Sequence, residues 1–210
     1  MNRNNGQNGH IRAASQKSYA IVLESQLPLK RRLVLLDSIR GKIDALWGQK
    51  RLKNLYSGGT LIEYSGYDRN SLFILSFADP LKKPQQWVSN DIGFMQHVLE
   101  LCTAYIPYGQ GQDIFQLLTH WYSIPPGSDI AFSKKVLVFR LLFLCGIHPE
   151  ENAYDPSLIA LISSSKDGMV HNEKDVEKRL EQWIIGSLHG VGGYDQLKTC
   201  AFVEWLGVTG

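Results

Sequence analysis

The sequence predicts an α+β protein in which a five-stranded β-barrel is followed by an all-α region. In the first part of the chain, apolar residues recur at every second position in short runs, which is typical of half-buried strands. Beyond residue 84 they recur every three to four positions, which is typical of helices. At 210 residues the chain is long enough for two such units. We therefore divide it into a disordered polar tail over residues 1–17, a barrel over 18–83 and a helical region over 88–210.

Five short apolar runs, each ended by turn residues, predict the strands of the barrel. The third run shows the pattern most clearly, because Ile43, Ala45 and Trp47 fall on one face. We expect residues 66–70 to form a turn and Asp79-Pro80 to end the last strand. The predicted strands are 19–25, 33–36, 42–47, 60–65 and 72–77. Five strands within about sixty residues fit an oligonucleotide-binding (OB) barrel, and an SH3-like barrel fits nearly as well.

The spacing beyond the barrel predicts a bundle of amphipathic helices. Pro107 and Gly109 end the first helix, and Asp113 is placed to cap the second. The third helix is apolar almost all round, which places it at the centre of the bundle, and Gly146 is its predicted stop. The predicted helices are 92–106, 114–122, 128–145, 155–162, 176–188 and 197–206.

Positive charge is concentrated in the predicted barrel. Residues 1–83 hold 14 Lys and Arg against 6 Asp and Glu, a balance of +8, and the rest holds 8 against 14, a balance of −6. This asymmetry indicates that the barrel meets a polyanion, although short cationic clusters are more often solvated surface. Loop cations would hold phosphates, and a tyrosine in the loop would stack on bases. The predicted nucleic-acid-binding residues are Lys30, Arg31, Arg32, Arg40, Lys42, Lys50, Arg51, Lys53 and Tyr56.

No catalytic or metal-binding pattern stands out in the sequence. The three cysteines, Cys102, Cys145 and Cys200, form no CxxC pair, and the six histidines show no HExxH spacing. Residues 190–193 lack the Gly-Lys-Ser/Thr of a phosphate loop, so we read them as an interhelical joint. The apolar run 136–145 is too short to cross a bilayer. We therefore expect a soluble cytoplasmic protein that is not an enzyme and that holds no cofactor and no metal.

The order of motifs along residues 20–150 also resembles a known family. The barrel motifs are 20–25, 32–36, 41–43 and 48–51, and the helical motifs are 99–101, 105–107, 114–118, 139–142 and 146–150. In this order they resemble the bacterial recombination mediator family RecO, whose helical domain has a similar G-x-x-P exit. The chain departs from the family in length and in residues 151–172, which hold none of the four zinc-binding cysteines of many members.

The resemblance implies an OB-fold N-terminal domain, a helical C-terminal domain and a role in DNA repair and homologous recombination. Such a mediator binds single- and double-stranded DNA, anneals complementary strands and helps load the recombinase RecA onto single strands coated by single-strand-binding protein. The implied partners are RecR and the acidic tail of single-strand-binding protein, in the cytoplasm at the nucleoid. By charge and position, that tail would meet Lys134, Lys135 or Arg140, although Arg140 fits equally well as a core-edge residue paired with a carboxylate.

A hypothesis from a different class is a non-catalytic adaptor. Its helical domain would dock a protein partner, and its basic barrel would not bind nucleic acid. A DNA-binding assay at two salt concentrations separates the two hypotheses, because only phosphate contacts make the affinity salt-dependent.

Overall fold

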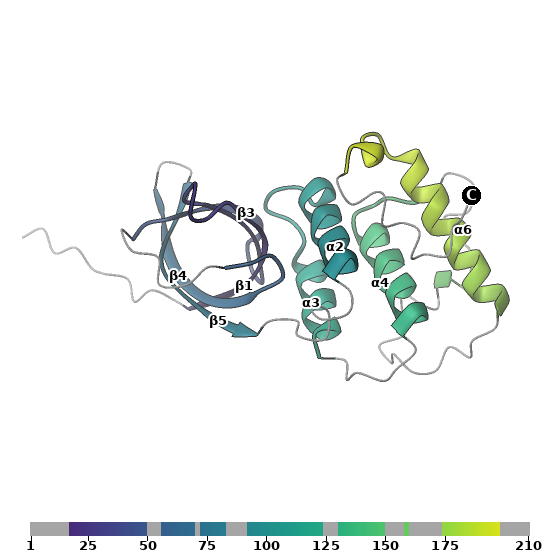
Figure 1. Cartoon of the computed structure of the whole chain (residues 1–210), viewed down its shortest axis with the longest axis horizontal. Coiled ribbons are helices and arrows are strands. Elements are labelled where there is room, and N and C mark those ends of the chain that lie inside the picture. The colour runs from purple at the N-terminus through teal and green to yellow at the C-terminus, as the bar shows by residue number, and fades with distance from the viewer. Residues whose placement is uncertain are drawn as a thin grey trace, which may run out of the picture.

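The chain forms a closed β-barrel with a group of helices packed against one side of it (Figure 1). This architecture confirms the predicted α+β layout of a five-stranded barrel followed by helices. The structure is a computed structural model, and it describes residues 17–49, 56–69, 72–82, 92–123, 130–149, 158–159 and 174–197. Almost all of the predicted polar tail lies outside these residues.

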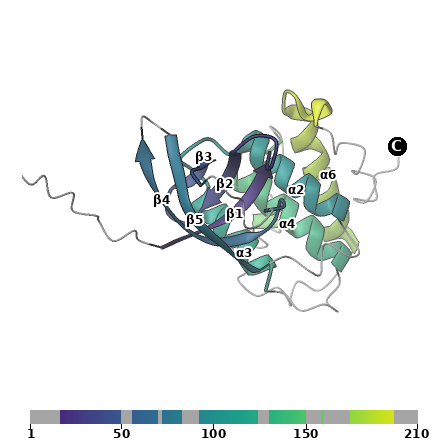
Figure 2. The ribbon, with the colours of Figure 1, turned by 60° about the vertical axis from the view of Figure 1, so that its left-hand side comes forward.

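The five strands close into a barrel in the order β1-β2-β3-β5-β4, with β4 returning to β1. They are β1 (Ser18–Ser25), β2 (Arg32–Asp37), β3 (Gly41–Trp47), β4 (Leu61–Arg69) and β5 (Leu72–Lys82). β3 and β5 run parallel, and the other neighbouring pairs are antiparallel. The β4–β5 hairpin lies on the side of the barrel away from the helices in both views (Figures 1 and 2).

Alternate residues of each strand fill the barrel. Ala45 and Trp47 point inward as predicted, and Trp47 is only 4% exposed. Removing each large apolar side chain from water stabilises the fold by roughly 1.5–3 kcal/mol. The other large members of this core are Leu33, Leu35, Tyr56, Ile62, Tyr64, Phe73 and Leu75. Because successive strand residues face opposite sides, their immediate neighbours point out of the barrel.

The last two strands are longer than the sequence indicates. β4 runs through the predicted turn to Arg69, and β5 continues past Asp79-Pro80 to Lys82. A bulge between Ser65 and Gly66 bends β4 at a point where a Cβ on Gly66 would lie 2.7 Å from the Phe73 ring. Pro80 is tolerated because it pairs beside a second bulge, at the start of β4.

The helical region contains four described α-helices and one short 3-10 helix. They are α2 (Ile92–Tyr105), α3 (Gln112–Trp121), α4 (Ile130–Leu144), α6 (Lys174–Gly190) and η1 (Tyr194–Gln196). α4 packs against both α3 and α6, which confirms its predicted central place (Figure 1). The predicted helices 155–162 and 197–206 fall almost wholly outside the described residues. None of the helices that the structure describes combines the length and hydrophobicity needed to span a membrane.

Glycines set the ends of two helices. Gly146, with a φ of 73°, ends α4 as predicted, and its N–H donates to the carbonyl of Phe143. The N-cap of α3 is Gly111, whose φ is 102°, so the prediction that Asp113 caps this helix is wrong. Asp113 instead lies in the first turn, where its negative charge is favourable next to the helix dipole.

The outward side of β1, of β2 after Arg32 and of the start of β3 (Gly41 and Lys42) is what we call the covered face, because the helices and the α2–α3 loop pack on it. Ile21, Leu23, Val34 and Leu36 belong to the same buried cluster as the helical core. α2 contacts β1, and α3 contacts β2. The barrel and the helices therefore share one apolar interface, and the part of the barrel wall beneath the helices cannot meet a ligand.

Candidate nucleic-acid interface

Outside the covered face, a row of outward side chains runs around the barrel wall, starting from Arg32 near Tyr108 of the α2–α3 loop. Arg32 pairs with Leu46, Leu46 lies beside Ile74, and Ile74 pairs with Tyr67, so the row crosses β2, β3, β5 and β4. Paired residues in a sheet point to the same side, and the inward neighbours of this row are core residues. We call the row, together with Asp44, Leu72 and Arg69, the open face.

The β4–β5 hairpin gives the open face its most exposed groups. Tyr67 is 52% exposed and Leu72 is 44% exposed. Arg69 follows Tyr67 by two positions, so both side chains leave the same side of β4. Arg69 is exposed, and it forms no ion pair within the described residues.

Two further arginines at this side of the barrel are held by carboxylates. Arg32 donates to Asp44 from Nε at 3.2 Å and from Nη2 at 3.0 Å. Arg40 donates from Nη1 to both oxygens of Asp68 at 3.1 Å, and its guanidinium lies 4.5 Å from the centre of the Phe73 ring. Exposed ion pairs of this kind contribute about 1 kcal/mol or less, so a phosphate can displace the carboxylates.

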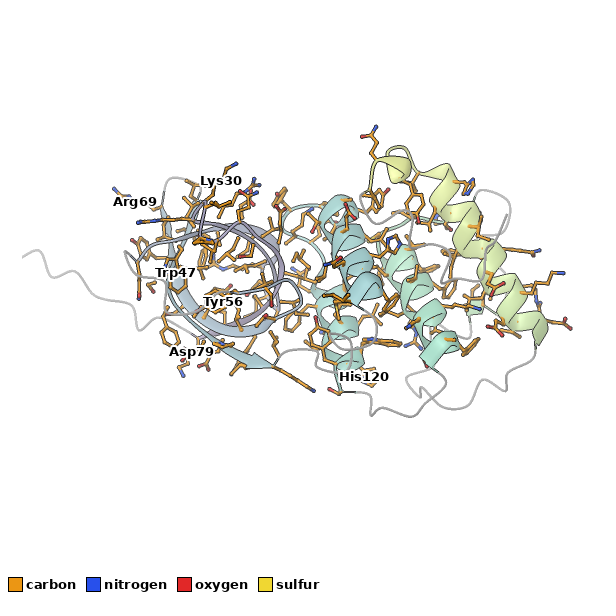
Figure 3. All side chains as sticks on the ribbon, in the orientation of Figure 1. Lys30, Trp47, Tyr56, Arg69, Asp79 and His120 are labelled. Atoms are coloured by element: carbon orange, nitrogen blue, oxygen red, sulfur yellow. The ribbon has the colours of Figure 1, made fainter. Side chains whose placement is uncertain are left out.

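The loop between β1 and β2 adds two unpaired cations. Lys30 and Arg31 are exposed, and neither forms an ion pair in the part of the chain that the structure describes. The backbone N–H of Trp47 donates to the Arg31 carbonyl at 2.8 Å, which fixes this loop beside the end of β3. Figure 3 shows Lys30 and Arg69 on the upper side of the barrel and Asp79 on the opposite side.

Lys42 does not belong to this surface, so its prediction as a nucleic-acid contact is wrong. Its side chain faces the helices and is 5% exposed. Nζ donates to the Thr103 carbonyl at 2.8 Å and lies 4.6 Å from the centre of the Tyr108 ring. Burial lowers the pKa of Lys42. The physical reason is that the loop between α2 and α3 pairs with the start of β3, so Lys42 joins the two parts of the fold.

Tyr56 was expected in an exposed loop, and this is also wrong. It is 2% exposed, its ring lies 5.7 Å from that of Trp47, and its hydroxyl donates to the Ala78 carbonyl at 2.7 Å. Figure 3 shows both labelled aromatic residues within the barrel. A base cannot stack on this ring while the barrel is folded. The remaining predicted contacts of that loop, Lys50, Arg51 and Lys53, lie outside the described residues.

The three cations predicted to meet an acidic protein tail have different surroundings. Lys135 is 7% exposed and donates to Glu177 at 2.6 Å and to Glu181, so it joins α4 to α6 and is unavailable to a partner. Burial alone would lower the pKa of Lys135, but these hydrogen bonds outweigh it and raise the pKa. Lys134 lies 5.4 Å from the centre of the Phe94 ring. Arg140 borders a pocket of only about 10 Å³ between α3 and α4, too small to form a groove for a peptide.

Burial favours the neutral forms of His97, Cys102 and Cys145. Burial lowers the pKa of His97 to about 4, although the carboxylate of Glu100 opposes the shift. Burial raises the pKa of the Cys145 thiol to about 11 and that of Cys102 further. Among the described residues, no three His, Cys, Asp or Glu side chains gather where they could hold a metal ion.

Sequence reasoning missed Tyr67 and Arg69. Their positions were assigned to a turn, because Gly66 and the polar residues after it are typical of loops. The alternation of Tyr67 with Arg69, continued across the tip by Leu72 and Ile74, was the available signal for a hairpin. No family model and no curated protein matches the chain.

Proposed function

We propose that the barrel is an OB-fold that binds nucleic acid and that the protein is a non-catalytic mediator of DNA repair and recombination. The strand order supports the first part. An OB-fold is a five-stranded Greek-key barrel, and here three antiparallel strands are followed by a hairpin whose second strand runs parallel to β3 and whose first strand closes on β1.

The observation that carries the proposal is the position of the unpaired cations. OB-folds bind oligonucleotides with the loops between strands 1 and 2 and between strands 4 and 5, together with the face of strands 2 and 3. In this chain Lys30 and Arg31 occupy the first of these loops, and Arg69 stands at the tip of the second hairpin. The helices cover much of the outer surface of β2, so the two loops and the open face remain for a ligand.

The mechanism of binding is electrostatic at these loops. Each phosphate that a cation neutralises releases counterions, which gives a log–log salt slope of about −0.7 per contact on single strands. If Lys30, Arg31, Arg32, Arg40 and Arg69 all engage, their combined slope is about −3.5. Two of these five must first exchange a carboxylate for a phosphate.

The mediator role is supported by the motif order that resembles the RecO family. On that basis the protein anneals complementary strands and helps load RecA onto single strands coated by single-strand-binding protein. RecR and the acidic tail of that coating protein are its proposed partners, in the cytoplasm at the nucleoid. Lys134 and Arg140 stay the proposed contacts for the tail, which would compete with contacts that each already makes within the protein, whereas Lys135 is held by Glu177 and Glu181.

The test is fluorescence anisotropy with a labelled 30-nucleotide single strand and its duplex at 50 and 200 mM salt. We expect Lys30→Glu with Arg31→Glu to weaken binding at least tenfold, because two attractive charges become repulsive. The matched control is Lys178→Glu with Arg179→Glu, an exposed pair on α6 with the same change in net charge. This control should stay within twofold of wild type. Equal losses in the two variants, or no salt-dependent affinity in the wild type, would overturn nucleic-acid binding at the barrel.

The mediator activity needs its own measurement. Two complementary labelled strands, each coated with single-strand-binding protein, should anneal faster with the wild type than with the Lys30→Glu, Arg31→Glu variant. Binding without any acceleration of annealing would leave a DNA-binding protein and remove the mediator role.

One set of observations favours the adaptor as a second candidate. Lys42 is engaged inside the protein, and Arg32 and Arg40 are paired with carboxylates, so the barrel offers fewer unpaired cations than its sequence suggests. The adaptor predicts affinity near zero at both salt concentrations in the same assay.

A further inference from the structure

We propose that the open face selects single-stranded nucleic acid by stacking bases on Tyr67, with Arg69 holding an adjacent phosphate. This inference rests on the nucleic-acid binding proposed above and adds the class of strand and the stacking residue. With Tyr56 in the barrel core, the stacking group of this barrel has to come from elsewhere on its surface.

Tyr67 has the position that stacking requires. It lies on a strand, pairs with Ile74 and is 52% exposed, so the strand fixes the position of its backbone while about half of the residue is open to solvent. Leu46 and Ile74 continue the same row, and both are half-buried. A base placed on the ring therefore meets an apolar surface on the barrel side and loses contact with water there.

The charges of the open face favour stacking over purely electrostatic binding. Arg32 is balanced by Asp44, and Arg40 at the neighbouring turn is balanced by Asp68. Arg69 is the cation of this face that has no ion pair among the described residues. One uncompensated charge attracts phosphates weakly, so most of the binding free energy on this face has to come from the bases.

This balance distinguishes single strands from duplexes. In a duplex the bases are stacked on one another, and the outside presents phosphates and groove edges. A single strand can turn a base onto an exposed aromatic ring, and such stacking tolerates any sequence because every base has a π-face. The open face thus has the chemistry of a single-strand platform, with little preference for base identity.

The test compares four variants on three ligands at fixed salt by fluorescence anisotropy. The variants are Tyr67→Ala, Tyr67→Phe, Arg69→Ala and the control Tyr19→Ala, which removes an aromatic ring that is 44% exposed on β1. The ligands are a 30-nucleotide thymidine strand, a duplex of equal length and an abasic strand with the same phosphates but no bases. Circular dichroism melting confirms that each variant is folded.

On the thymidine strand, Tyr67→Ala should lose at least fivefold in affinity with an unchanged salt slope. Arg69→Ala should lower the magnitude of that slope by about 0.7, because it removes a phosphate contact. Tyr67→Phe keeps the ring and should stay within twofold of wild type, as should Tyr19→Ala. On the duplex and on the abasic strand, Tyr67→Ala should change the affinity less than twofold.

A Tyr67→Ala variant that binds the thymidine strand like wild type would overturn the stacking role. An equal loss on the abasic strand would also overturn it, since the effect would not involve bases. In either case the loss caused by Lys30→Glu with Arg31→Glu would persist, so nucleic-acid binding itself would stand. If the wild type binds none of the three ligands, both proposals fail together.

Discussion

The covered face and the open face are both built from the outward residues of alternating strands, yet a cation is buried on the first and exposed on the second. Lys42 is an outward residue of β3 that meets the α2–α3 loop, gives its Nζ to a backbone carbonyl and is removed from solvent. Arg69 is an outward residue of β4 that meets no helix and stays exposed. The packing partner of the strand decides whether a positive charge joins two parts of the fold or remains available to a ligand.

The ion pairs of the protein are also of two kinds, buried and exposed. Lys135 is 7% exposed and lies between two helices, so its carboxylate partners compensate a buried charge. Arg32 and Asp44 lie in solvent, where their pairing contributes little to stability. Surface pairs of this second kind can exchange partners, which a binding face requires.

The largest expected effect is on the covered face, at Gly41. A Cβ on Gly41 would lie 2.3 Å from the Gln110 carbonyl oxygen, and the φ of 71° is unfavourable for other residues. Gly41→Ala should lower the free energy of unfolding by roughly 2–4 kcal/mol, measured by urea denaturation. Gly109→Ala is the control, because its φ is 80° but nothing lies within 4 Å of its Cβ. Equal losses would show that the close approach of this loop to β3 is not required.

The second prediction is a loss of folding stability at acidic pH caused by His97. The pKa of His97 is about 4 in the folded state and about 6.5 when unfolded, so the unfolded state binds more protons between these values. Stability should therefore fall as the pH falls from 6.5 to 4, by roughly 2–3 kcal/mol at pH 4.5. His97→Gln should remove this part of the pH dependence in urea titrations. The arginines of the open face do not titrate in this range. If His97→Gln lost stability at low pH as the wild type does, groups other than His97 would cause the pH dependence.

The third prediction tests the buried cation. Lys135→Met should cost about 1–2 kcal/mol of unfolding free energy, less than for a fully buried pair because Glu177 and Glu181 remain partly exposed. Arg32→Met, which breaks the exposed pair with Asp44, should cost less than about 1 kcal/mol. If Arg32→Met lowered the denaturation midpoint more than Lys135→Met, the buried pair would not be the stronger of the two.

The smallest expected effect is on the open face. Asp44→Asn releases Arg32 and removes a negative charge, so affinity for single strands should rise about two- to fivefold at low salt. Asp79→Asn, on the opposite side of the barrel, is the matched control for the change in net charge (Figure 3). A similar rise in both variants would mean that the strand senses overall charge and has no preferred face.

The strands and helices could be predicted from the sequence because burial recurs every second residue in the strands and every three to four residues in the helices. Trp47 was placed correctly in the core for this reason. The extent of β4 was not predictable in this way, since Gly66 reads as a turn residue and its actual role is to let the Phe73 ring approach the backbone. Alternation in the sequence separates inward from outward residues of each strand, but it does not show which outward residues the helices cover.

The candidate site was predictable in its loops and not on its strands. Lys30 and Arg31 stand in a loop between two recognised strands, so their exposure follows directly. The burial of Lys42 and of Tyr56 depends on residues distant in the chain. Lys42 packs against α2 and the α2–α3 loop, and the Tyr56 hydroxyl donates to the Ala78 carbonyl. Lys135 likewise depends on α6, whose carboxylates approach it from more than forty positions away.

The contacts of two lysines tie the barrel to the helices at separate points. Lys42 reaches the Thr103 carbonyl in α2, and Lys82, at the end of β5, donates to the Tyr122 carbonyl after α3 at 2.6 Å. Two attachment points together with a shared apolar interface oppose rotation of one part against the other. A nucleic-acid strand bound on the hairpin side would therefore keep a constant direction relative to α2 and α3.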